Sequence, residues 1–274
     1  MKIAFAFLVH NEETLQGFQQ FLTNYYSSNH HYFIHFDKKL EKVEFPLPNV
    51  HVVEQQVNAK WGKYSLLYSE LLLLKASTNY RYNFLYFMDG MTVPIRPLKD
   101  LEDYLQNLNP DSCAIFDRKP FPACRYDRSA CKRTKAKCID KECTQYDLTP
   151  NNAPVYKFSQ WVMLSRPFID HLFSEAKWFA DWIDFFKHTS IPDESFFQTL
   201  LMDSPFNETQ VYENPMYTRW TDCQKYPTRK GGKSPCWLLG ADHMEVVTSD
   251  KWFVRKLGMQ SELREILYEE IQEL

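Results

Sequence analysis

The chain has 274 residues, enough to bury a full hydrophobic core in either one large α/β domain or two small domains. Its 32 basic and 35 acidic residues give a formal net charge of -3. This balance argues against a nucleic-acid-binding protein, because general phosphate affinity needs a basic excess. The aromatic content of 16% is high. Aromatic rings stack on the C–H faces of sugars, but they also fill protein cores, so composition alone does not choose between these uses.

Apolar runs of strand length recur along the first part of the chain, with helical patterns between several of them. The predicted strands are Ile3–Val9, Tyr32–Phe36, Val50–Val53, Phe84–Met88 and Ala114–Phe116, and the clearest predicted helices are Thr14–Tyr26 and Ser65–Ala76. This alternation predicts an α/β fold with a mainly parallel central sheet flanked by helices. Ligands bind beyond the carboxyl ends of the strands in such sheets, so the residues directly after these runs are candidates for a binding site.

The regular pattern stops between Asp117 and Asn152, in a basic stretch that we expect to be a loop insertion at about 117–152 in a single domain, 1–274. The stretch holds Cys124, Cys131, Cys138 and Cys143. None of their spacings is the C-x2-C pair typical of a zinc site, so disulfides, a metal clip and free thiols all stay open.

Regular structure is expected again at Val155–Leu164, in a helix near Pro167–Phe186 and in an acidic amphipathic helix at Ser261–Leu274. The apolar run at Ile3–Val9 is too short to span a membrane. We therefore expect a soluble, cytoplasmic protein or a lumenal domain trimmed of its anchor, and peripheral membrane association stays open.

The segment Ile191–Leu201 carries two adjacent carboxylates, Asp193 and Glu194, directly before an apolar run at helical spacing. Because Asp193 follows a proline, it is predicted as the N-cap of a helix with Glu194 in the first turn. Negative charge is favourable at that end of a helix, so capping explains the pair by itself.

Several short motifs resemble those of a known family, and they occur along the chain in the same order as in that family. Pro192-Asp-Glu-Ser-Phe-Phe197 resembles the segment that carries the catalytic base in the core-2/I-branching N-acetylglucosaminyltransferases and the peptide O-xylosyltransferases. Further resemblances lie at Phe7–His10, Ile34–Asp37, Ala59–Gly62, Leu85–Arg96, Phe158–Arg166, Tyr217–Trp220, Gly232–Pro235 and Trp252–Lys256. Thr92 stands at the family's usual aspartate position, Asp89 comes earlier, and Phe158 replaces a usual glycine. The resemblance implies a GT-A-type, Rossmann-like, nucleotide-sugar-binding fold.

The same resemblance implies a role for each candidate site residue. Glu194 would be the catalytic base, and Asp37, with Val9 beside it, would hold the uridine of a UDP-sugar. The other donor-binding residues implied by the family are Trp61, Ser159, Gln160, Trp161, Lys233, Arg255 and Lys256. The last three would meet the charge that develops on the departing diphosphate. No Asp-x-Asp motif follows a predicted strand, so no metal cofactor is expected.

The resemblance therefore implies an inverting, metal-independent glycosyltransferase. It would move N-acetylglucosamine, xylose or glucose from a UDP-sugar to a hydroxyl of a glycan or glycosylated acceptor, giving a β linkage. The basic loop would help to choose an acidic acceptor. One alternative is a non-catalytic carbohydrate-binding protein. A glycosidase is less favoured, because its two acids lie roughly 5–9.5 Å apart across the bond, whereas adjacent side chains on a helix diverge.

Overall fold

The structure is a computed structural model of the chain, and it describes residues 1–108, 114–115, 121–122, 149–211, 213, 215–220, 223 and 234–273. The strands are β1 (Ile3–Val9), β2 (His31–Phe36), β3 (Val50–Val52), β4 (Phe84–Asp89), β5 (Val93–Pro94), β6 (Ala114–Ile115), β7 (Phe121–Pro122), β8 (Tyr156–Lys157), β9 (Met163–Ser165), β10 (Met216–Tyr217) and β11 (Phe253–Val254). The helices are α1 (Glu12–Tyr25), α2 (Tyr64–Ser77), α3 (Leu98–Asn107), α5 (Arg166–Ser174), α6 (Ala176–Phe186), α7 (Phe196–Met202), α8 (His243–Val247) and α9 (Glu262–Glu273), and the 3₁₀ turns are η2 (Pro150–Asn152), η3 (Pro192–Glu194) and η4 (Gly240–Asp242).

In the described part of the chain, the central sheet has the strand order β3-β2-β1-β4-β9-β6. The first four of these strands are parallel, and β9 runs antiparallel to both of its neighbours. The chain moves outward from β1 to β3 and then returns to place β4 on the other side of β1. The strand order thus reverses between β1 and β4, and ligands bind beyond the carboxyl ends of the strands at such a switch point.

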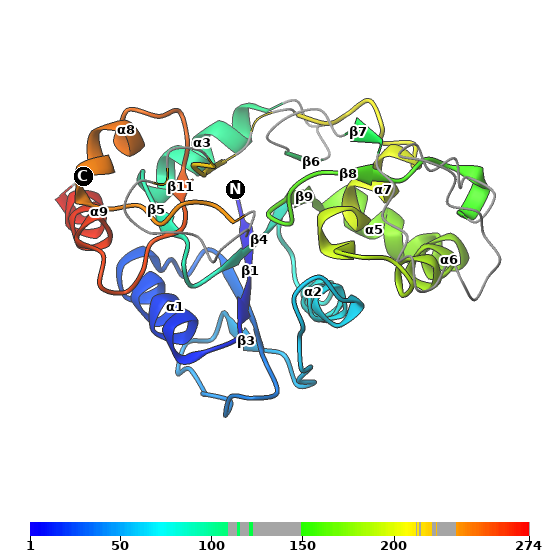
Figure 1. Cartoon of the computed structure of the whole chain (residues 1–274), viewed down its shortest axis with the longest axis horizontal. Helices are drawn as coiled ribbons and strands as arrows, with labels where there is room; N and C mark the ends of the chain where they lie inside the picture. Colours follow the sequence, from blue (N-terminus) through cyan, green and yellow to red (C-terminus); the bar gives the residue numbers. More distant parts are fainter. Residues whose placement is uncertain are drawn as a thin grey trace.

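The alternation of side chains along β1 supplies a hydrophobic core on each face of the sheet. Ala4, Ala6 and Leu8 pack in the core on the α2 side, whereas Phe5 and Phe7 belong to the core on the α1 side. Figure 1 shows α1 and α2 on opposite sides of β1. Because both faces are buried, β1 is apolar at every position, as expected for a central parallel strand.

A small second sheet, with the order β10-β11-β5, extends the core beside β1 and β4. Phe253 of β11 packs its ring 5.3 Å from Tyr86 of β4 and 6.3 Å from Phe5 of β1, measured between centroids. β11 ends at Val254, so this packing fixes where Arg255 and Lys256 leave the sheet.

The predicted α/β architecture with a mainly parallel sheet is confirmed, but three local predictions are wrong. The helix expected near Pro167–Phe186 is two helices, α5 and α6, because Glu175 between them leaves the helical conformation with ψ of 52°. Phe158–Trp161 is not part of a strand, since the Phe158 N–H donates to the carbonyl of Glu194 (2.7 Å) instead of to a neighbouring strand.

The third wrong prediction is that Asp193 is an N-cap. Asp193 and Glu194 lie in the 3₁₀ turn η3, and Ser195 occupies the N-cap position of α7. The turn follows Ile191, whose φ of 53° and ψ of 56° place it in the left-handed region. Residues other than glycine rarely adopt this backbone conformation. This conformation turns the chain before α7 begins, so the two carboxylates precede the helix.

A close approach between α1 and the turn after β4 gives a stability test. A Cβ at Gly17 would lie 1.9 Å from the carbonyl oxygen of Gly90. Alanine normally stabilises a helix interior by about 1 kcal/mol over glycine. The backbone clash outweighs that gain, and we expect Gly17→Ala to lower the free energy of unfolding by at least about 1–3 kcal/mol in urea titrations. Gly258→Ala is the control, because its Cβ would meet nothing closer than 3.7 Å; equal stability of the two variants would contradict the packing argument.

Candidate active site

Polar side chains gather at the carboxyl ends of β1, β2 and β4, beside the switch point. His10 follows β1, Asp37 follows β2 and Asp89 ends β4. Burial lowers the pKa of His10, and the charges of Asp89, Lys39, Asp37 and Arg255 also act on it, with the acids opposing the effect of burial. Because β2, β1 and β4 are neighbouring parallel strands, these three residues lie at one edge of the sheet. This edge of the sheet is where the sequence pattern predicted a binding site.

Asp37 organises the backbone around it. Its own N–H donates to the carbonyl of Val9 (2.8 Å), and its carboxylate accepts hydrogen bonds from the N–H groups of Ala59 (2.9 Å) and Lys39 (3.0 Å). The side chain is only 1% exposed. Asp37 therefore fixes the start of the segment that leads to Trp61, whose ring is 78% exposed.

The turn that carries Glu194 is tied to two other segments. The N–H of Ile191 donates to the carbonyl of Gly62 (3.0 Å), directly after Trp61, and the carbonyl of Glu194 accepts from Phe158. The Glu194 carboxylate is 29% exposed and lies 3.0 Å from Lys157 Nζ. A partly exposed carboxylate is thus held between the Trp61 segment and the Ser159–Trp161 segment.

The Ser159–Trp161 segment is held by contacts with α7, α2 and Arg255. The carbonyl of Ser159 accepts from the Gln198 amide of α7, and Gln160 Nε2 donates to Oε1 of Glu70 on α2 (2.8 Å). Trp161 is nearly buried, and the guanidinium of Arg255 lies 4.5 Å above its ring centroid. These contacts bring the candidate residues of the segment and Arg255 together.

Arg255 also pairs with Asp89 inside the protein. Its Nη2 donates to Asp89 Oδ2 at 2.8 Å, and the two side chains are 9% and 6% exposed. The other oxygen of Asp89 accepts from the N–H of Met91 (3.0 Å) and the hydroxyl of Thr92 (3.3 Å). Asp89, to which the family resemblance assigned no role, therefore fixes Arg255 against Trp161.

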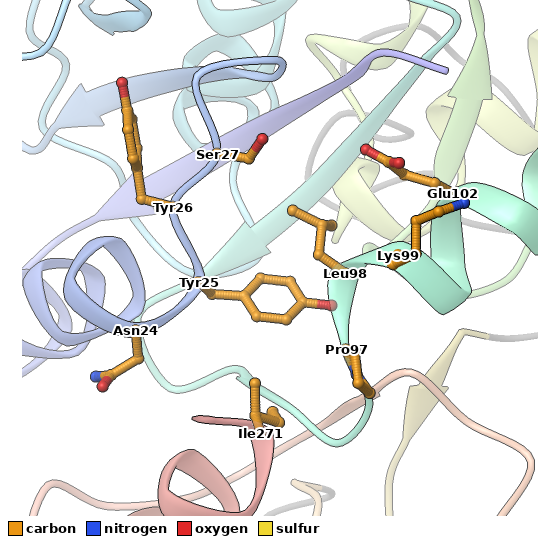
Figure 2. Close-up of a pocket in the computed structure, with 9 residues that line it drawn as sticks. All are labelled: Asn24, Tyr25, Tyr26, Ser27, Pro97, Leu98, Lys99, Glu102 and Ile271. Atoms are coloured by element: carbon orange, nitrogen blue, oxygen red, sulfur yellow. The ribbon is translucent and has the colours of Figure 1, made fainter. Parts of the chain in front are cut away.

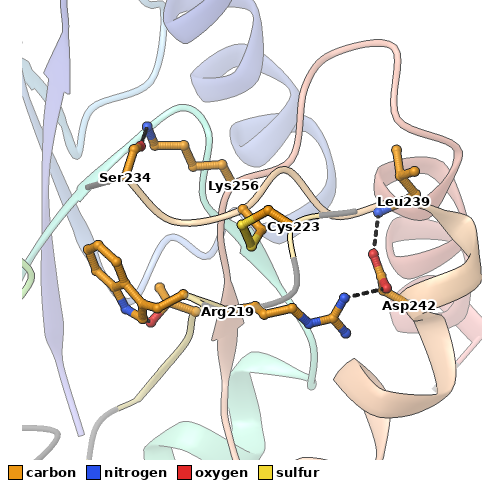
Figure 3. Close-up of a disulfide and its surroundings, with 9 residues drawn as sticks. Arg219, Cys223, Ser234, Leu239, Asp242 and Lys256 are labelled. Carbon is orange, nitrogen blue, oxygen red and sulfur yellow. Dashed lines mark hydrogen bonds and ion pairs between the residues drawn. A yellow bond between two sulfur atoms is a disulfide. The ribbon is translucent and has the colours of Figure 1, made fainter. Parts of the chain in front are cut away.

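Lys256 lies one residue further along, beside a disulfide between Cys223 and Cys236. Its Nζ donates to the Ser234 hydroxyl at 2.8 Å (Figure 3). It also lies 5.7 Å from the centroid of the Trp237 ring. Burial is the main cause that lowers the Lys256 pKa, and Arg255 adds to it. The N–H of Cys236 donates to the carbonyl of Arg219, so the disulfide connects two segments that already touch.

Lys233 and the four cysteines of the basic loop lie outside the described residues, as does most of that loop, so their predicted roles stay predictions. In the part of the chain that the structure describes, no three His, Cys, Asp or Glu side chains gather closely enough to hold a metal ion. No helix among the described residues is both long and apolar enough to cross a membrane.

A cavity of about 350 Å³ lies away from these residues. It is lined by the end of α1, the start of α3 and the end of α9, with Tyr25 pointing towards Pro97 and Leu98 (Figure 2). α1 starts at the carboxyl end of β1, so its last residues lie at the opposite edge of the sheet. The cavity is therefore not part of the candidate site. That site lies at the carboxyl ends of the strands, where α/β sheets bind ligands.

Sequence analysis missed two acids of the site. Asp89 was noted but given no role, because its partner Arg255 is distant in sequence. Glu70 is fully buried and was predicted only as part of the helix Ser65–Ala76. The signal for Glu70 was available, since it is a lone carboxyl in the apolar run Leu66–Leu74, and carboxyl groups are almost never fully buried unless paired.

Comparison with known proteins decides the family. The family model of the Core-2/I-Branching enzymes matches residues 3–247, well over half of the chain. The chain belongs to the core-2/I-branching enzyme family. The resemblance that the short motifs suggested is thereby confirmed, and the match includes β1, the Glu194 turn and most of the segments described above.

Two relatives of this chain are xylosyltransferases. Xylosyltransferase oxt of Drosophila melanogaster is 26% identical over 241 residues, which cover 80% of this chain and 26% of the fly protein. Xylosyltransferase 1 of Homo sapiens is 26% identical over 232 residues, covering 80% of this chain and 24% of the human protein. The chain thus spans about a quarter of the length of the curated relatives it matches.

Two solved structures also align with this core-2/I-branching chain. Mouse xyloside xylosyltransferase 1 in its apo form gives a TM-score of 0.35 at 14% identity, covering 76% of this chain and 84% of the mouse chain. An active-site mutant of LgtC gives 0.45 at 10% identity, covering 100% of this chain and 95% of that chain.

The buried Asp89–Arg255 pair gives a second prediction. Removing one partner of a buried ion pair leaves an uncompensated charge, which costs about 3–5 kcal/mol. We expect Asp89→Ala to lower the free energy of unfolding by that amount, and the double variant Asp89→Ala/Arg255→Met to recover part of the loss. Chemical denaturation measures both.

The control is Lys177→Ala, which breaks the exposed Lys177–Asp181 pair and should change stability by less than about 0.5 kcal/mol. If Asp89→Ala is no more destabilising than this control, the ion pair does not hold the site together.

Proposed function

We propose that this protein is an inverting glycosyltransferase with a GT-A-type fold, which transfers a sugar from a UDP-sugar to an acceptor hydroxyl with a β linkage. The observation that carries the proposal is the position of Glu194. In a chain of the core-2/I-branching family, it is a partly exposed carboxylate between the Trp61 segment and the Ser159–Trp161 segment. Both segments are ones that the family resemblance assigns to the donor.

Glu194 would act as the general base. The carboxylate takes the proton from the acceptor hydroxyl while that oxygen attacks the anomeric carbon and the bond to the diphosphate breaks. Lys157, 3.0 Å from one carboxylate oxygen, holds the side chain in place. A positioned base of this kind contributes roughly 10²–10⁴-fold to the rate.

Lys256 is the best-placed described cation for the diphosphate. Arg255 already neutralises Asp89, whereas the polar partner of Lys256 among the described residues is the neutral hydroxyl of Ser234. The lowered pKa of Lys256 means that burial disfavours its charged form. An arriving diphosphate would relieve that cost, since an opposite charge favours the ammonium ion.

The uridine is proposed to lie near Val9 and Asp37. Because the Asp37 carboxylate already accepts two backbone hydrogen bonds, its part in the proposal is to shape the edge of this subsite through Lys39 and Ala59. The names of the relatives favour xylose as the transferred sugar, so UDP-xylose is the donor that we test first.

The test of the function is UDP release from a panel of UDP-xylose, UDP-N-acetylglucosamine and UDP-glucose with candidate acceptors. We expect release with one donor and its loss in Glu194→Gln, because the amide keeps the shape of the side chain but cannot take the proton. The affinity for UDP should stay within about threefold, since the base contacts the acceptor.

The matched control is Glu269→Gln, an exposed acid on α9, which should keep full activity. Full turnover in Glu194→Gln would remove Glu194 from the mechanism. A carbohydrate-binding protein without catalytic activity would release no UDP from any donor, and a glycosidase would gain no thermal protection from UDP.

We further expect transfer to persist in excess EDTA. Lys256 brings positive charge to the diphosphate side, and no Asp-x-Asp motif follows a strand. Initial rates of UDP release before and after EDTA treatment measure this. Loss of activity that manganese restores would contradict metal independence, whereas Lys256→Ala should slow transfer whether or not EDTA is present.

A further inference from the structure

Glu70 is a carboxyl group enclosed in an apolar environment. It lies in the middle of α2, where Leu67, Leu71 and Leu74 contribute to the core on the same side of the sheet. Its side chain is completely buried. Burying a carboxyl costs free energy unless hydrogen bonds compensate, so a group in this position needs a partner.

The partner is the side-chain amide of Gln160. Gln160 Nε2 donates to Glu70 Oε1 at 2.8 Å. Gln160 is half-buried, whereas Glu70 is buried. An amide has one end that donates and one that accepts. Because the amide nitrogen is the end bonded to Glu70, the accepting end, Oε1, is left for a different partner. Among the described residues, that oxygen has no hydrogen-bond donor.

The same carboxyl group lies beside the Glu194 turn. α2 packs against η3, and the charge of Asp193 in that turn acts on Glu70. Burial raises the pKa of Glu70 well above its ordinary value, the charge of Asp193 raises it further, and the Gln160 hydrogen bond opposes both. The Gln160 hydrogen bond thus favours the carboxylate form of Glu70, which can only accept hydrogen bonds.

Resting on the proposed transfer reaction, we propose that Glu70 is a positioning residue that fixes the amide of Gln160, so that Gln160 Oε1 accepts a hydrogen bond from a hydroxyl of the donor sugar. Glu70 does not touch the donor itself. Its role is to prevent the amide from turning over and presenting its N–H groups instead. Recognition would then require a hydrogen-bond donor on the sugar at that point.

The experiment compares dissociation constants for UDP and UDP-xylose, with UDP-N-acetylglucosamine as a second sugar probe. We expect Glu70→Met and Gln160→Ala each to weaken UDP-xylose about tenfold, which is about 1.4 kcal/mol, while UDP stays within about twofold. The double variant should lose no more than either single variant, because both remove the same contact. Glu70→Gln should stay within about threefold of the parent, since its amide oxygen still accepts from Gln160.

Circular dichroism and thermal melts check the fold of each variant. If Glu70→Met does not fold, Glu70→Asp replaces it, because the shorter side chain withdraws the carboxyl from Gln160 and should cause the same selective loss. Unchanged UDP-xylose affinity, equal losses for UDP and UDP-xylose, or additive losses in the double variant would overturn the role of Glu70. A parent protein that binds no UDP would instead overturn the proposed function, and this inference with it.

Discussion

The buried ion pair between Asp89 and Arg255 is the interaction on which the candidate site depends. It joins the end of β4 to the residue after β11, which lies 166 positions later in the chain. The pair is stable inside the protein because the second oxygen of Asp89 is also satisfied, by Met91 and Thr92. Arg255 is therefore available to cover Trp161, and Lys256 follows at the edge of the site. This pair and the contact of Arg255 with the Trp161 ring link the small sheet β10-β11-β5 to the Ser159–Trp161 segment.

Hydrogen bonds, mostly between loops, hold the remaining parts of the site. The Glu194 turn contacts Gly62 on one side and Phe158 on the other. Asp37 fixes the approach to Trp61, and α2 supports Gln160 through Glu70. These hydrogen bonds keep the Glu194 carboxylate in one position. They leave the sheet undisturbed, because they lie beyond the ends of its strands.

The sheet was predictable because periodicity is a local signal. β1 matched its predicted bounds, and most of the other strand and helix ends moved by one or two residues. The wrong predictions concern backbone geometry and distant contacts. The left-handed conformation of Ile191 placed Asp193 before the helix rather than at its cap, and no spacing rule reports such a conformation. Likewise, Glu70 and Asp89 become part of the site through Gln160 and Arg255, which lie 90 and 166 residues away.

The aromatic side chains of the described residues lie partly in the core and partly at the surface. Phe5, Phe7 and Phe21 pack edge to face in the core beside α1, so core packing explains part of the aromatic content. In contrast, the exposed large apolar side chains among the described residues include Trp61, Trp220 and Trp237, at 78%, 58% and 37% exposure. Each lies in a segment that is hydrogen-bonded to the Glu194 turn or to the surroundings of Lys256. The exposed rings that could stack on sugars in these segments are therefore those of tryptophan. The large tryptophan ring can remain partly exposed without weakening the core.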